Sequence, residues 1–171
     1  MRQKAETNYR SGSTGSSVSS ETKAGQAKDH AGLCEKIRSI LASAGEPDSE
    51  DWQDSIFALE LAPLIRKYGE IAVKCVEQTI ADAGCGELAA GESLEFLGRL
   101  DDPPTSDIRL HALQRGLLSR SAKIRAGAVF GMAYKRDTRA LPSLSRAIKK
   151  ETSSMLREHM EKIRQRMEER R

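Results

Sequence analysis

Apolar side chains recur at the three- and four-residue spacing of amphipathic helices from about residue 29 onward. Only isolated short runs look like strands, so the pattern predicts an all-α fold. Pro63 should kink or split its helix, because proline removes a backbone donor. Glycines, prolines and polar turns divide the pattern into eight expected helices in four pairs, over residues 29–43, 50–67, 70–83, 87–100, 107–118, 121–135, 139–149 and 152–170.

Several features recur at the length of one helix pair. Gly98 and Gly131 lie 33 residues apart, and an aliphatic–Arg pair that starts at Ile124 recurs 32 residues later at Leu156. Helix pairs of this length build α-solenoids, in which neighbouring pairs stack to bury apolar stripes that one pair cannot cover. We therefore expect an α-solenoid of about four helix pairs over residues 29–171. An ordinary helical bundle with accidental spacing is the alternative.

One unit, residues 121–148, has a fuller pattern, made of Ile124-Arg125-Ala126 near a helix start, Asp137 in the next turn, and Ala140-Leu141-Pro142 at the next helix start. This order resembles the HEAT repeat, in the short variant also found in phycobilisome-lyase-like proteins. The match is fair at the last helix and weak from 50 to 105. The resemblance implies a HEAT-like solenoid whose usual role is to bind other proteins, with an arginine that braces a turn or a neighbouring helix. The repeat positions that it implies are Arg125, Gly131, Asp137, Pro142 and Arg157.

The two ends of the chain differ from this pattern. Residues 1–28 are rich in Ser, Thr, Gly and Lys and lack apolar periodicity, so we expect a disordered tail. It could be a linker, an expression remnant or a partner-binding segment. The last helix has a narrow apolar stripe and a polar outer face, which is typical of the cap of a solenoid. A short coiled-coil or partner helix is the alternative.

The net charge of +3 conceals a separation along the chain. Residues 46–107 hold 15 acidic and 4 basic residues, a net of −11, and residues 115–150 hold 10 basic residues and one acidic residue, a net of +9. We expect a non-catalytic scaffold whose basic C-terminal half binds an acidic surface of another protein. Binding to nucleic-acid phosphates, head-to-tail self-association and simple solvation of helix faces are the alternatives. The expected contact residues are Lys123, Lys135, Arg136, Arg139, Arg146, Lys149 and Lys150.

Motifs for catalysis are missing from the sequence. It contains neither a glycine-rich phosphate loop nor a nucleophile motif, so no cofactor and no small-molecule substrate are expected. The HEAT resemblance also touches lyases and DNA glycosylases, and an enzyme of that type is the third alternative. Aromatic residues make up only 4% of the chain, which argues against stacking on nucleic-acid bases.

The cysteines and apolar runs bear on the compartment. Cys34, Cys75 and Cys85 form no CxxC pair and leave one cysteine over in any disulfide scheme, which points to a reducing compartment and a buried free thiol at Cys75. No metal site is expected, because Cys75 and Cys85 lack His or Cys companions nearby in the sequence. No apolar run is long enough for a membrane helix and no signal peptide is evident, which predicts a cytoplasmic protein.

Overall fold

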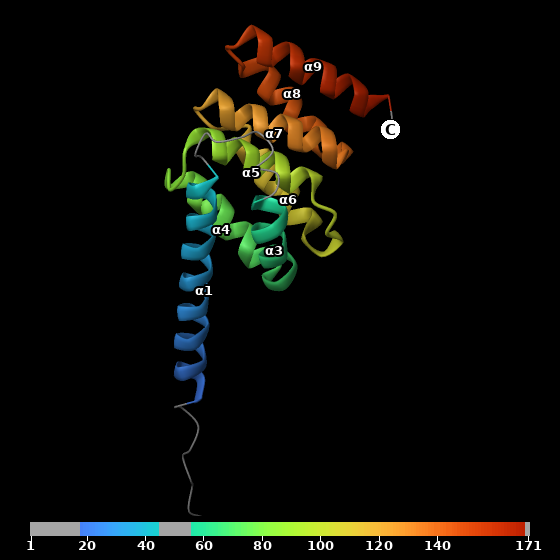
Figure 1. Ribbon diagram of the computed structural model, residues 1–171. Coiled ribbons are helices and arrows are strands. Elements are labelled where there is room, and N and C mark those ends of the chain that lie inside the picture. Colours follow the sequence, from blue (N-terminus) through green and yellow to red (C-terminus); the bar gives the residue numbers. More distant parts are fainter. Residues whose placement is uncertain (1–17, 45–55, 170–171) are drawn as a thin grey trace, which may run out of the picture.

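The computed structural model describes residues 18–44 and 56–169, and all regular structure within these ranges is helical (Figure 1). Two short 3-10 turns, η2 and η3, and a π-helical turn, η1, accompany the α-helices. The elements in chain order are α1 (Val18–Ser43), η1 (Phe57–Leu61), α3 (Ala62–Tyr68), α4 (Glu70–Ala81), α5 (Glu87–Arg99), η2 (Pro103–Thr105), α6 (Ser106–Gly116), α7 (Ala122–Lys135), η3 (Thr138–Ala140), α8 (Leu141–Lys150) and α9 (Ser154–Glu168).

Helix α1 differs most from its prediction, because it begins at Val18 instead of near residue 29. Residues 18–28 therefore form helix where a disordered tail was expected, and residues 1–17 lie outside the described residues. The segment from Glu21 to Lys28 contains several strong helix formers, which allow a helix to continue beyond its apolar stripe.

The predicted helix over 50–67 is continuous from Ile56 to Tyr68, but its hydrogen-bonding pattern changes just before the proline. The π-helical turn η1 runs directly into α3, and Leu61 and Ala62 both keep helical dihedrals, so the π-helical turn lies immediately before Pro63. Residues 50–55 of that prediction lie outside the described residues. Gly69 then separates α3 from α4 with φ of 58°, a left-handed conformation that favours glycine.

Four pairs of consecutive helices pack against each other, namely α3 with α4, α5 with α6, α6 with α7, and α8 with α9. In Figure 1, α7, α8 and α9 lie in succession above α5 and α6. Helix α4 packs against α1, α3 and α6, and α7 packs against α5, α6 and α9. The N-terminal half of α1 extends away from the other helices (Figure 1). Within the described ranges, no helix has the length and apolar character needed to span a bilayer.

The closest helix contact is between α5 and α7, where glycines face glycines. A Cβ built on Gly98 would overlap the backbone of Gly131, and one on Gly127 would lie 2.6 Å from the Cα of Gly91. These pairs share one face of each helix, at four- and seven-residue spacing. The helices can therefore meet backbone to backbone, which explains the small-residue face that the sequence shows around Gly127.

Candidate partner-binding site

A groove with a volume of about 570 Å³ opens between α6 and α8. We call it the α6–α8 groove and define it by Arg115, Leu118, Arg146, Ala147 and Lys150. The three cations are exposed, and none forms an ion pair with another described residue. The side chain of Leu118 is 77% exposed, so the rim offers an apolar contact beside the positive charge.

The carboxylate that lines this groove belongs to Glu151, and its negative charge is balanced by Arg125. Arg125 donates two hydrogen bonds of 2.7 Å to the carboxylate of Glu151, whose side chain is fully buried. The backbone N–H groups of Thr152 and Ser153 donate to the same carboxylate at 2.9 Å. The hydrogen bond from Arg125 is the main reason that the pKa of Glu151 falls to about 2. The field of the groove is therefore set by its unpaired cations.

Arg125 also braces the turn before α7, as the HEAT resemblance implied. Its guanidinium donates to the carbonyl oxygens of Ser119 at 3.1 Å and Arg120 at 2.8 Å. Arg157 occupies the same fourth position in α9, and donates to the carbonyl oxygen of Glu151 at 3.2 Å. These two arginines fasten the loops that form one end of the groove.

A third arginine of this kind, Arg109, was missed by sequence reasoning. It is the fourth residue of α6 and is 3% exposed. It donates to the carbonyl oxygens of Leu97 at 2.6 Å and Asp102 at 2.8 Å, which lie at and after the end of α5. The last carbonyls of a helix lack partners within the helix, and Arg109 supplies one. The sequence did contain a signal for Arg109, because Ile108 and Arg109 form another aliphatic–Arg pair like the one at Ile124.

Two of the predicted contact residues are engaged within the molecule. Arg139 donates to Asp137 at 2.6 Å and to Asp107 at 2.8 Å, and its hydrogen bond lowers the pKa of Asp137. Lys135 donates to the hydroxyl of Ser106 at 2.6 Å, and burial is the main reason that its pKa is lowered. Both side chains hold α7 and the following turn against the start of α6, which leaves them poorly placed for a partner.

The other predicted cations are exposed without an ion pair among the described residues, but they do not share one face. Arg146 and Lys150 line the α6–α8 groove, whereas Arg136 lines a second hollow between α7 and α9 together with Arg166. Arg115 belongs to the groove but was not among the predicted contact residues. The remaining exposed cations of the prediction are Lys123 and Lys149.

The second hollow has a volume of about 490 Å³ and an aromatic lining. Phe130 and His159 lie with ring centroids 6.2 Å apart, and Tyr134 is half-exposed beside them. Arg136 takes the left-handed conformation with φ of 55° at the end of α7. We call this the α7–α9 hollow, and the sequence did not predict it because its rings come from two helices.

The other residues that the HEAT resemblance singles out lie in turns, helix starts and helix contacts. Asp137 accepts a hydrogen bond of 3.0 Å from the backbone N–H of Arg139 and so caps η3. Pro142 lies in the first turn of α8, which it was predicted to open. Gly131 lies at the close contact between α5 and α7.

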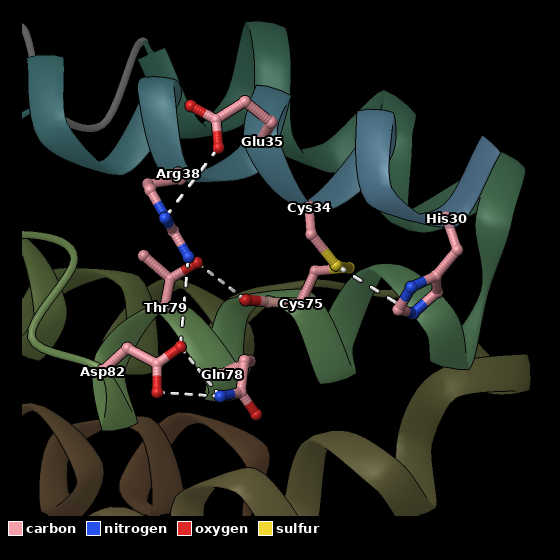
Figure 2. The surroundings of a disulfide bond; sticks show 8 residues. All are labelled: His30, Cys34, Glu35, Arg38, Cys75, Gln78, Thr79 and Asp82. Atoms are coloured by element: carbon pink, nitrogen blue, oxygen red, sulfur yellow. Dashed lines mark hydrogen bonds and ion pairs between the residues drawn. A yellow bond between two sulfur atoms is a disulfide. The ribbon is translucent and has the colours of Figure 1, made fainter. Parts of the chain in front are cut away.

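The cysteine predictions need correction. Cys34 of α1 and Cys75 of α4 form a disulfide with a Cα–Cα distance of 4.9 Å, so Cys75 is not a free thiol (Figure 2). His30 lies beside them, so Cys75 has His and Cys companions in space that are distant from it in the sequence. Cys85 is the free cysteine, and burial raises the pKa of its thiol. The inference of a reducing compartment, which relied on free thiols, loses its basis.

Comparison with known proteins gives no guide to these sites, since the chain matches no protein-family model, no curated protein and no solved structure.

Proposed function

We propose that this chain is a HEAT-like helical-repeat scaffold that binds an acidic segment of another protein in the α6–α8 groove. The observation that carries the proposal is the set of three unpaired cations, Arg115, Arg146 and Lys150, around one groove. Support for the repeat comes from the packing of α5 against α7 and of α7 against α9. The recurrence of a bracing arginine in α7 and α9 supports it further.

The groove favours a protein segment over a nucleic acid because it combines positive charge with exposed apolar surface. Leu118 is exposed at the rim, and the largely buried Ala147 lines the groove beside Arg146 and Lys150. An acidic peptide with an aliphatic side chain matches both features, whereas a phosphate backbone matches the charge alone. The lining of the groove contains no Phe, Tyr or Trp, and its one ring is the imidazole of His111, so it offers less ring surface to bases than the α7–α9 hollow does.

Nucleic acid is the second candidate, and the α7–α9 hollow is the observation that favours it. Phe130, Tyr134 and His159 provide ring faces there, and Arg136 and Arg166 provide positive charge. Rings next to cations are the usual combination in proteins that bind single strands. The two candidates therefore use different faces of the molecule and can be separated by variants.

Two triple variants with equal change in charge test the proposal. Arg115→Glu, Arg146→Glu and Lys150→Glu remove the positive groove, and Lys123→Glu, Arg136→Glu and Arg166→Glu are the matched control. The probes are a fluorescent peptide of Glu and Leu, its Lys and Leu counterpart, and a single-stranded oligonucleotide. Fluorescence anisotropy measures Kd at low salt and at about 0.15 M salt.

We expect the acidic peptide to bind and the groove variant to weaken binding by about tenfold or more, a loss of roughly 1.4 kcal/mol or more. The control variant should bind as the parent protein does. Equal losses in both variants, or no peptide binding by the parent protein, would contradict the proposal. Binding of the oligonucleotide alone, lost in the control triple, would establish the second candidate instead.

A further inference from the structure

The structure gathers three metal-ligating side chains at the contact of α1 and α4. We propose that His30, Cys34 and Cys75 form a zinc site when their disulfide is reduced. The imidazole and the two sulfur atoms all lie within 4.8 Å of one another, and Nε2 of His30 is 4.0 Å from Sγ of Cys34 (Figure 2). This proposal is independent of partner binding in the α6–α8 groove.

Local sequence and packing together explain why the three side chains converge. His30 and Cys34 are four residues apart on α1, so they lie on the same face of the helix. Helix α1 packs against α4, where Cys75 is buried on the facing side. The Cα atoms of the two cysteines are 4.9 Å apart, so small rotations of their side chains can separate the sulfurs enough to share one ion.

The donor set selects the kind of metal. Two thiolates and an imidazole are the ligands that zinc prefers, whereas magnesium and calcium require oxygen ligands. Three protein ligands leave one position of a tetrahedral ion open. His30 is exposed, Cys34 is half-buried and Cys75 is buried, so solvent reaches the three side chains from the side of His30. A water molecule or an external ligand would occupy the open position.

Formation of the site begins with reduction of the disulfide. One thiolate of a dithiol reductant attacks a sulfur of the Cys34–Cys75 bond to give a mixed disulfide. The second thiolate of the reductant then displaces the protein sulfur. The protein gains two electrons and two protons as two thiols, and the reductant leaves as its own disulfide. Binding of Zn²⁺ by the two thiols as thiolates then releases two protons.

The charges near the cysteines do not oppose a cation. Arg38, one turn beyond Cys34, is 3.9 Å from the carboxylates of both Glu35 and Asp82 (Figure 2). Its charge is therefore compensated by two acidic side chains. In either state a bond fastens α1 to α4, through the disulfide when oxidised and through zinc when reduced. Oxidation would expel the metal, because a disulfide has no thiolate to donate.

The proposal is tested with the full chain after its disulfide has been reduced with a phosphine. Cobalt(II) is titrated into this protein first, and zinc is added afterwards. We expect a one-to-one complex with the visible spectrum of tetrahedral cobalt and a thiolate-to-cobalt charge-transfer band, both abolished by zinc. The oxidised protein should show neither band. Cys34→Ser and Cys75→Ser should abolish the charge-transfer band. His30→Gln should weaken binding by more than the roughly 10–100-fold that follows loss of an outer-shell partner.

Cys85→Ser and His159→Gln are the matched controls, and both should bind cobalt as the parent protein does. Circular dichroism reports whether each variant folds, and His30→Gln, at an exposed position, keeps the test valid if Cys75→Ser unfolds. The proposal is overturned if the reduced protein gives no tetrahedral spectrum, if His30→Gln binds with unchanged affinity, or if Cys85→Ser removes the signal. The first outcome would leave a disulfide without a metal function, and the other two would show that the metal is held by a different set of ligands.

Discussion

At the scale of single residues, three arginines have the same structural role, and each is the fourth residue of its helix. Arg109, Arg125 and Arg157 each direct a guanidinium to a carbonyl oxygen of a loop outside their own helix. A guanidinium presents several donors in a fixed plane, so one side chain can satisfy several carbonyls at once. Glu151 joins two of these arginines, because it binds Arg125 through its carboxylate and Arg157 through its carbonyl. It is therefore the residue on which the end of the α6–α8 groove depends most.

Glu151→Gln should lower the free energy of unfolding by about 3 kcal/mol at neutral pH. The folded pKa of Glu151 is about 2, below its ordinary value of 4.5. Its stabilising effect is therefore complete above about pH 5 and is lost as the pH falls towards 2. Urea unfolding at a series of pH values should show the difference between the parent protein and the variant shrinking over that range.

Glu158→Gln is the control for this measurement. Glu158 pairs with Lys162 on the exposed surface of α9, where an ion pair contributes little. We expect the variant to keep the stability of the parent protein at any pH. A pH-independent effect of Glu151→Gln would mean that its ionised carboxylate does not stabilise the fold.

At the scale of helices, the contact of α5 with α7 depends on the absence of side chains. The backbones meet at Gly98 and Gly131, and again at Gly91 and Gly127. A backbone cannot move aside as the end of a flexible side chain can, so the helices must separate if a methyl group is added. Both helices also carry flanking core residues, so separation would loosen the layers on either side.

Gly98→Ala should lower the free energy of unfolding. Alanine has the higher helix propensity and would add about 0.5–1 kcal/mol, but overpacking against the backbone of Gly131 costs about 1–3 kcal/mol. We expect the steric cost to dominate in denaturant unfolding. Gly32→Ala is the matched control, because a Cβ there meets no atom within 4 Å and should stabilise α1. Equal effects of the two substitutions would contradict the close contact.

At the scale of the whole molecule, long-range links join the two oppositely charged parts of the chain and fasten α1. Arg139 of the basic block binds Asp107 of the acidic block at 2.8 Å, across 32 residues. Cys34 and Cys75 join α1 to α4 across 41 residues. The charge separation seen along the sequence thus ends at a contact between the blocks, and only part of the basic block faces outward.

Reduction of the disulfide with a chelator present should lower the free energy of unfolding by about 2–4 kcal/mol, because a closed loop of this length restricts the unfolded chain. Thermal unfolding followed by circular dichroism, with and without reductant, measures the change. Cys85→Ser should leave the difference unaltered, since Cys85 is outside the link. A Cys34→Ser variant that still shows the full response to reductant would contradict the assignment.

The sequence by itself determined the helices and their breaks. The periodicity placed α4 to α9 within a few residues of their observed ends, and it anticipated the break at Gly69. At Pro63 the helix changes its hydrogen-bonding pattern but does not split. These features depend on neighbours within about one helical turn, so a single pass along the chain reveals them. The prediction that α1 starts near residue 29 was wrong, because residues 18–28 have helix propensity but no apolar stripe, and propensity alone gives a weaker pattern.

Only the tertiary structure decided which cations are available and which cysteines are paired. The partners of Arg125, Arg139 and Cys34 lie 26, 32 and 41 residues away in the sequence. No local pattern encodes such distances, because they follow from how the helices pack. Sequence reasoning therefore located the basic block but could not separate Lys135, which is bound to Ser106, from Lys150, which lines the groove.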